Sequence, residues 1–183
     1  NSNVTGATDA TIADSTVGNI SMNGTLNATN STVGDVTGAT SATLDDADTG
    51  SISMAGDNGD ITITNGSLVQ GNVTNANDVT INGSKVTGTV QTDGELNATN
   101  ADIQGGLTAD SEVTSANISG SSIGSGITSS GAVTITDKST ISGAVSGTVV
   151  SVTDSTTGDV TATTGDATIT DSTVGAVTSD AGN

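Results

Sequence analysis

Few residues in this sequence could carry out chemistry. The chain has no His, Cys or aromatic residue, its only basic residues are Lys85 and Lys138, and it contains 20 Asp and Glu residues. Acid–base catalysis by histidine, nucleophilic catalysis by cysteine and binding of anions by arginine are therefore excluded. What remains is the chemistry of carboxylates, amides and hydroxyls. We expect that the protein is not an enzyme and holds no cofactor.

The carboxylates give the chain a net charge of −18. Hard cations such as Ca²⁺ prefer several oxygen ligands, so the neighbouring Asp45, Asp46 and Asp48 are candidates for a weak calcium site. The alternative, favoured in so acidic a chain, is that these side chains are simply solvated. Nucleic acids and anionic membranes are not expected partners, because their phosphates bind Lys and Arg. No stretch is apolar over the length of a membrane span, so membrane insertion is not expected either.

Asparagines followed two residues later by Ser or Thr could accept N-linked glycans. These sequons predict a glycoprotein, and with it an extracellular or cell-surface location. The alternative is that they arise by chance, because the chain is rich in Ser and Thr. The candidate acceptors are Asn3, Asn19, Asn23, Asn27, Asn30, Asn65, Asn72, Asn82, Asn97 and Asn117.

Glycines recur roughly every 17 residues, each followed two positions later by an aliphatic residue. A unit this short cannot bury its own apolar face, so the units must stack on one another in a solenoid. Glycine suits a corner where the backbone turns with positive φ or passes close to a neighbour. One step is blurred, near Gly124 and Gly126. The glycines assigned to corners are Gly18, Gly34, Gly50, Gly71, Gly88, Gly105, Gly143, Gly158 and Gly175.

Between the glycines, short runs alternate aliphatic residues with threonine, which is typical of strands with one buried face. An Asn or Asp follows each run and suits a left-handed corner. Three short runs and three corners per repeat predict an all-β fold. We expect a single-stranded, roughly triangular β-helix (β-solenoid) of about ten coils, forming one domain over residues 1–183. The corner Asn and Asp are Asp14, Asn30, Asp46, Asn65, Asn82, Asn100, Asn117, Asp137, Asp154 and Asp171.

The repeats also predict details within each coil. Because aromatic residues are absent, we expect a narrow core of aliphatic side chains, with inward residues in the second run such as Val33, Leu68 and Val86. Two repeats are longer than the others. Since insertions in a solenoid lie at corners, we expect loops at 55–59 and 119–125.

Some runs carry Thr-x-Thr pairs, in the segments 62–64, 134–136 and 168–170. Flat rows of threonine on a β-solenoid can order water, so ice binding is a third functional hypothesis. Only some coils carry the pair, and the polar outer face of a half-buried strand is the simpler interpretation.

The period, the triangular coil and the all-aliphatic core resemble those of the bactofilins, a family of β-helical proteins. That resemblance implies end-to-end polymerisation without nucleotide. The bias towards Ser, Thr, Asn and Gly is similar to that of the β-solenoid stalks of secreted adhesins and surface fibres. Both resemblances cover the whole chain and rest on period and composition.

The repeat continues to both ends of the chain without a visible capping element. The segments 9–18 and 166–175 differ only in having Ala13 in one and Thr170 in the other. Because the first and last coils are so similar, copies could stack head to tail, and such heterologous contacts produce filaments. We therefore expect a structural subunit of an extracellular filament. The alternative is a stalk or passenger segment of a secreted adhesin, with its external surface or glycan ligand unknown.

Overall fold

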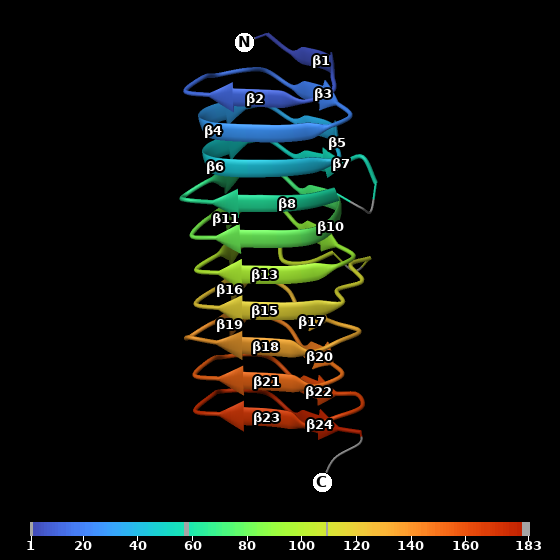
Figure 1. Ribbon diagram of the computed structural model, residues 1–183. Coiled ribbons are helices and arrows are strands. Elements are labelled where there is room, and N and C mark those ends of the chain that lie inside the picture. The colour runs from blue at the N-terminus through green and yellow to red at the C-terminus, as the bar shows by residue number, and fades with distance from the viewer. Residues whose placement is uncertain (1, 57–58, 109, 181–183) are drawn as a thin grey trace.

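The structure is a computed structural model that describes residues 2–56, 59–108 and 110–180. The described chain is all-β and winds through about ten turns of roughly 17 residues. Parallel strands of successive turns stack into a rod, with β1 at one end and β24 at the other (Figure 1). The predicted β-solenoid is confirmed. The described residues form no helix, and so none that could cross a membrane.

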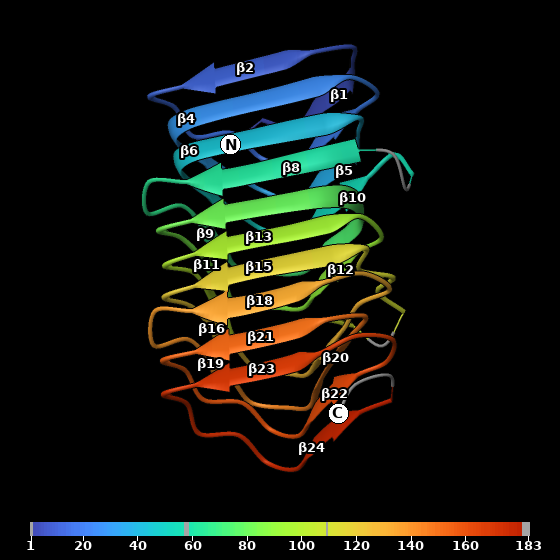
Figure 2. The same cartoon turned by 60° about the horizontal axis from the view of Figure 1, so that its bottom comes forward.

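The first sheet holds the longest strands and follows the whole rod (Figures 1 and 2). Alternation places its aliphatic side chains inside and its Thr, Ser and Asn outside. Pairing is parallel and in register, so that Ile63 lies between Leu44 and Ile81. Its strands are β2 (Ala10–Ala13), the first half of β4 (Thr25–Val33), the first half of β6 (Ser41–Thr49), β8 (Gly59–Thr64), the second half of β10 (Val73–Asn82), β13 (Glu95–Thr99), β15 (Ser115–Ser119), β18 (Val133–Thr136), β21 (Val150–Thr153) and β23 (Ala167–Thr170).

The second sheet is made of very short strands. They are the second halves of β4 and β6, then β9 (Leu68–Val69), β11 (Lys85–Val86), β14 (Asp102–Ile103), β16 (Ser122–Ile123) and β19 (Thr140–Ile141). The third sheet closes each coil. It contains β1 (Val4–Ala7), β3 (Ile20–Met22), β5 (Val36–Ala39), β7 (Ile52–Met54), the start of β10, β12 (Val90–Thr92), β17 (Ile127–Thr128), β20 (Val145–Gly147), β22 (Val160–Ala162) and β24 (Val177–Ser179). The three faces agree with the predicted triangular coil.

The core is a narrow column of aliphatic side chains. Leu26 and Ala28 in β4 pair with Ala42 and Leu44 in β6, so large and small residues alternate between neighbouring coils. All four are at most 2% exposed. This interdigitation buries the core side chains without any aromatic ring.

One of the two expected loops is wrong. The segment 119–125 is an ordinary coil that contains the end of β15 and all of β16. The extra residues lie earlier, between β14 and β15, and lengthen the offset between successive coils to 20 at Ala101 and Ser121, against 16 at Ser15 and Ser31. The other expected loop lies between β7 and β8, and residues 57 and 58 in it fall outside the described residues.

An extra corner residue reverses the alternation in the fourth coil. Asn65 and Gly66 both have positive φ, at 57° and 84°. The phase shift turns Leu68 outward, in register with Asp48, while Val69 faces the core and is 0% exposed. The expected inward position of Leu68 is therefore wrong.

The corner between the first and second sheets carries a left-handed residue in every coil, and a second one in the fourth and eighth coils, where Gly66 and Lys138 have φ of 84° and 63°. Eight of the predicted Asn and Asp residues occupy it. Asn82 and Asn117 do not, because they lie inside β10 and β15, and glycines with φ of 59° replace them. The column comprises Asp14, Asn30, Asp46, Asn65, Gly83, Asn100, Gly120, Asp137, Asp154 and Asp171.

The predicted glycine ladder forms a second column, between the second and third sheets. None of its nine glycines has positive φ, so the left-handed turn is not the reason for glycine there. Close approach is the reason: a Cβ on Gly50 would lie less than 3.0 Å from the Asp35 carboxylate of the preceding coil. The backbone continues the column, since the Gly34 N–H donates to the Gly18 carbonyl at 3.1 Å. The column comprises Gly18, Gly34, Gly50, Gly71, Gly88, Gly105, Gly143, Gly158 and Gly175, and in the blurred repeat Ser125 takes the position.

Candidate functional site

The two end coils are where the core is least covered among the described residues. In the first coil Ile12 is only half-buried. In the last coil Ile169 is half-buried and Val177 is 48% exposed, whereas their partners one coil inward, Val152 and Val160, are 0% exposed. The end coils are therefore the candidate functional site.

Backbone donors line the edge of the last coil. Between the last two coils, N–H groups of the inner coil donate to carbonyls of the end coil. The donor and acceptor pairs are Val150 to Asp166 (3.2 Å), Asp154 to Thr170 (3.0 Å), Thr157 to Thr173 (3.0 Å) and Val160 to Ala176 (2.8 Å). By the same periodicity, the equivalent N–H groups of the last coil point away from the rod. They belong to Ala167, Asp171, Val174 and Val177.

A ladder of buried serines follows the left-handed corner, and the sequence interpretation missed it. The Ser121 hydroxyl accepts the N–H of Ala101 in the preceding coil (2.9 Å) and donates to the Ser119 carbonyl (2.8 Å). Such a hydroxyl satisfies a corner carbonyl of its own coil and a backbone donor of the coil before it. Six serines make both contacts: Ser31, Ser67, Ser121, Ser139, Ser155 and Ser172. Ser15, which is exposed, and Ser84 only donate to the carbonyl of their own corner. The signal was present, because a Ser or Ala follows the corner in every coil, directly or after one extra residue.

A second side-chain ladder follows the glycine column and points in the opposite direction. Asn19 Oδ1 accepts the N–H of Asp35 in the next coil (3.0 Å), and Asp35 Oδ1 in turn accepts the N–H of Ser51 (2.8 Å). Asn72 and Asp159 do the same at 2.9 and 2.8 Å. These side chains therefore act as structural links between coils.

Two outward rows of short polar side chains run along the first sheet, and we call them together the hydroxyl–amide face. The Thr-x-Thr pairs of β8, β18 and β23 all lie on it. The inner row comprises Thr11, Asn27, Thr43, Thr62, Thr80, Asn97, Asn117, Thr134, Ser151 and Thr168. The outer row comprises Ala13, Thr29, Asp45, Thr64, Asn82, Thr99, Ser119, Thr136, Thr153 and Thr170.

Acidic residues flank this face on both sides, and we call the two flanking rows the acidic edges. One edge is the outward row just before the inner row on the same sheet and contains Asp9, Asp60, Asp78, Glu95 and Asp166. The other lies at the left-handed corner and contains Asp14, Asp46, Asp137, Asp154 and Asp171. Half of the 20 acidic residues thus flank this face.

The three calcium candidates are not gathered into one ligand set. Asp45 lies on the first sheet and accepts a hydrogen bond from Asn65 Nδ2, Asp46 is the left-handed corner residue, and Asp48 lies on the second sheet beside Leu68. Within residues 2–56, 59–108 and 110–180, no group of three or more Asp or Glu side chains is placed to hold a metal ion.

The candidate glycosylation sites are spread around the rod. All ten asparagines are exposed except Asn97, which is half-buried. Several have side chains engaged between coils: Asn30 Nδ2 donates to Asp14 (2.6 Å) and Asn117 Nδ2 to Asn97 (3.0 Å). The exposure of these side chains is compatible with modification.

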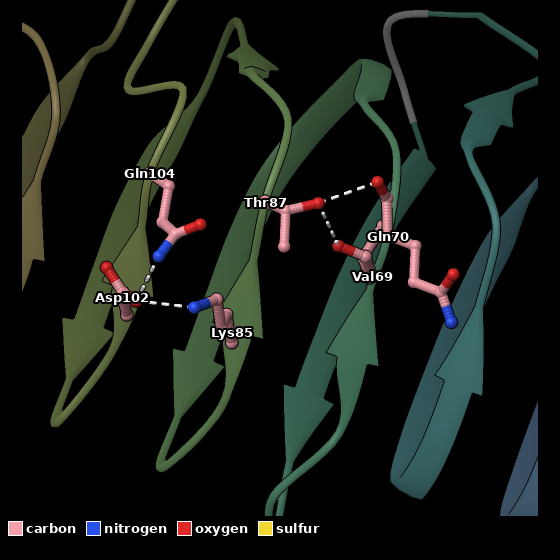
Figure 3. A network of polar contacts seen from close by, with 6 residues as sticks. All are labelled: Val69, Gln70, Lys85, Thr87, Asp102 and Gln104. Carbon is pink, nitrogen blue, oxygen red and sulfur yellow. Dashed lines mark hydrogen bonds and ion pairs between the residues drawn. The ribbon is translucent and has the colours of Figure 1, made fainter.

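The second sheet carries the ion pair found among the described residues. Lys85 Nζ lies 3.2 Å from Asp102 Oδ2, which also accepts a hydrogen bond from Gln104 Nε2 at 3.1 Å (Figure 3). One coil away, the Thr87 hydroxyl donates to the Gln70 carbonyl at 2.6 Å. Both groups of contacts link neighbouring coils, and the two charged side chains are about 40% exposed. They are links along the rod, with the modest strength of surface pairs.

One carboxyl at the left-handed corner has a shifted pKa. Hydrogen bonds from the Ser119 hydroxyl (2.6 Å) and the Thr136 hydroxyl (2.9 Å) stabilise the charged form of Asp137 and lower its pKa. The side chain is solvent-exposed, so this is a local effect of the hydroxyls.

No protein-family model matches this chain. No curated protein and no solved structure matches it either. The function of the chain must therefore be inferred from its own structure. The features that bear on it are the end coils, the side-chain ladders between coils and the hydroxyl–amide face.

Proposed function

We propose that the protein is a structural subunit that lengthens by stacking the last coil of one copy on the first coil of the next. The observation that carries this proposal is the match of the two end coils. Both have the sequence of an ordinary coil over 9–18 and 166–175, and both leave core residues half-covered. Stacking would cover those side chains on each copy.

The expected junction follows the register of the interior coils. Val177 would pair with Val4 of the next copy, as Val160 pairs with Val177, and Ile169 would pair with Ile12. The four outward N–H groups of the last coil would then reach carbonyls of the first coil. The corner ladder supports the same register, because Ser155 N–H donates to Ser172 Oγ at 3.1 Å and Ser172 N–H would donate to Ser15 Oγ.

The like charges at such a junction have a precedent inside the rod. Asp166 would lie next to Asp9 of the following copy. The same stacking occurs between Asp60 and Asp78, where the Asp78 N–H donates to Asp60 Oδ1 at 3.2 Å. A backbone donor between the two carboxylates offsets part of their repulsion.

Charge substitutions in β24 test the proposal. Val177→Lys places a cation on the face that the junction would bury, and burial of an unpaired charge is costly. Thr178→Lys adds the same charge to the outward side of the same strand. Electron microscopy and sedimentation should show filaments for the unmodified chain and for Thr178→Lys, and short rods for Val177→Lys. Isolated rods of the unmodified chain at every concentration would refute self-assembly.

A second candidate function is a stalk within a longer adhesin. The observation in its favour is that the end coils have ordinary coil sequences, so they could stack on further coils of the same chain. Attaching one extra designed coil after residue 180 separates the two proposals. A stalk segment gains a coil and remains a single rod, whereas a self-assembling subunit still forms filaments through the new end.

We place this filament outside the cell, with copies of itself as its partners. Support comes from the exposed sequon asparagines, such as Asn23 and Asn27. Mass spectrometry of native material tests the location. Glycan mass on these peptides is the expected result, and bare peptides throughout would contradict the glycoprotein proposal.

A further inference from the structure

The two ends of the rod carry charges of the same sign. The charged side chains of the described end coils, residues 2–18 and 166–180, are all acidic: Asp9, Asp14, Asp166, Asp171 and Asp180. All five are exposed. Both lysines of the chain lie further inside, in β11 and in the turn between β18 and β19. Two surfaces that bear the same sign of charge repel each other as they approach.

The carboxylates of the first coil have no like-charged neighbour in the coil that follows. The second coil, residues 19–34, contains no Asp or Glu. Its donors instead stabilise the charges of the first coil. The Thr25 N–H donates to Asp9 Oδ1 at 2.8 Å, and the amide of Asn30 donates to Asp14 Oδ1 at 2.6 Å. A single rod therefore carries these two charges without repulsion from its own next coil.

Stacking would give each of these carboxylates an acidic neighbour. In the register of the interior coils, Asp166 of one copy would lie beside Asp9 of the next. At the left-handed corner, Asp154 and Asp171 already lie in successive coils, and Asp14 of the next copy would follow them. Neighbouring coils are about 4.8 Å apart. At that distance in water, Coulomb repulsion lowers an association constant by about fourfold for each pair, and by roughly tenfold or more for two.

We propose that ionic strength controls the stacking of end coils, which is weak at low salt and favourable at high salt. This regulation rests on the proposed end-to-end growth. The Debye length is about 30 Å at 0.01 M salt, so the charges of both ends act across the junction. It is about 3 Å at 1 M, which is shorter than the spacing of the coils. The apolar part of the junction, such as Ile12 against Ile169, does not depend on screening.

Neutral substitutions at the first coil test this control. Asp9→Asn with Asp14→Asn removes both charges, keeps an oxygen that can accept the two hydrogen bonds, and suits the φ of 48° at position 14. The matched control is Asp110→Asn with Glu112→Gln. It makes the same change of net charge at exposed positions between β14 and β15, far from both ends.

A third variant replaces repulsion at the junction by attraction. Asp9→Asn with Asp14→Lys would place a cation beside Asp171 of the neighbouring copy. The left-handed corner accepts lysine, since Lys138 has a φ of 63° in the eighth coil. This variant should need no added salt to form filaments.

Sedimentation gives the critical concentration for growth, and electron microscopy gives filament length, at about 0.01, 0.1 and 1 M NaCl. The unmodified chain and the matched control should be single rods at the lowest salt and filaments at the highest. At low salt, the neutral first-coil variant should have a critical concentration about tenfold below that of the control, and the lysine variant the lowest of all. The differences should fade at about 1 M.

Two results separate this regulation from the stacking on which it rests. If the unmodified chain grows equally well at every salt concentration, or the control gains as much as the neutral first-coil variant, stacking stands and its control by salt is wrong. If all four chains remain single rods at every salt concentration, stacking itself is refuted.

Discussion

Ser139 Oγ accepts the backbone N–H of Ser121, one coil away, at 3.1 Å. The same hydroxyl donates to the Thr136 carbonyl at 2.6 Å, and Ser139 is 1% exposed. One buried side chain thus joins two coils at the corner where no β-sheet ladder runs. The arrangement recurs in most coils and links neighbouring coils at this corner.

Ser139→Ala should lower the free energy of unfolding by about 1–3 kcal/mol, because the buried Ser121 N–H loses its acceptor. The variant should still fold, since Ala47 and Ala101 occupy the equivalent position in other coils. Chemical denaturation measures the change. The exposed Ser142→Ala is the matched control and should cost far less. Equal stability of the two variants would argue against the ladder.

Gly50→Ala should destabilise the rod by about 1–3 kcal/mol through overpacking against Asp35. Asp35 Oδ1 accepts the Ser51 N–H at 2.8 Å and occupies the space that a Cβ would need. Asp35→Ala removes both the obstacle and this hydrogen bond. In a double-mutant cycle followed by thermal unfolding, Gly50→Ala should therefore cost less in the Asp35→Ala background. The same cost in both backgrounds would mean that close approach is not why this position is glycine.

The sequence predicts the fold well because the period repeats in every coil. The prediction from sequence fails in the coils whose length differs from the others. The second left-handed residue, Gly66, reverses which of Leu68 and Val69 faces the core, and periodicity alone does not reveal an extra corner residue. The insertion before β15 likewise moved Asn117 from an expected corner into a strand.

The proposed assembly surface was predictable from sequence only as a pattern. The likeness of the segments 9–18 and 166–175 can be read directly, whereas the half-exposure of Ile12 and Ile169 requires the coil geometry. The serine ladder was visible as a Ser shortly after most of the corner residues, but its role depends on hydroxyl positions. The two rows of the hydroxyl–amide face become apparent only once the strands are in register.

Asp137 should titrate below the usual range for aspartate, because the Ser119 and Thr136 hydroxyls donate to its charged form. A carboxyl whose pKa is lower in the folded state adds stability above its unfolded pKa. That contribution is lost as the pH falls through the folded pKa. NMR titration of the Asp137 carboxyl should show an upward shift in Ser119→Ala. Ser122→Ala, an exposed change on the second sheet, should leave it alone; an unmoved Asp137 in Ser119→Ala would contradict the assignment.

Asp154 lies between Asp137 and Asp171 in the left-handed column, so three like charges stack at successive coils. In the first four coils of the column Asn alternates with Asp, and Asn30 Nδ2 donates to Asp14 Oδ1 at 2.6 Å. Asp154→Asn should therefore stabilise the rod by about 0.5 kcal/mol at low salt, through lost repulsion and a new donor. Asn also tolerates the φ of 48° at this position.

Salt separates the electrostatic part of that gain from any other. At about 1 M salt the Debye length falls to about 3 Å, which is shorter than the spacing of neighbouring coils. The advantage of Asp154→Asn in thermal unfolding should shrink accordingly. Asp110→Asn makes the same change of net charge in an exposed turn outside the column and should bring little gain at either salt concentration. If both variants gain alike, the effect belongs to the overall charge of the rod, and the stacking of Asp137, Asp154 and Asp171 is not its source.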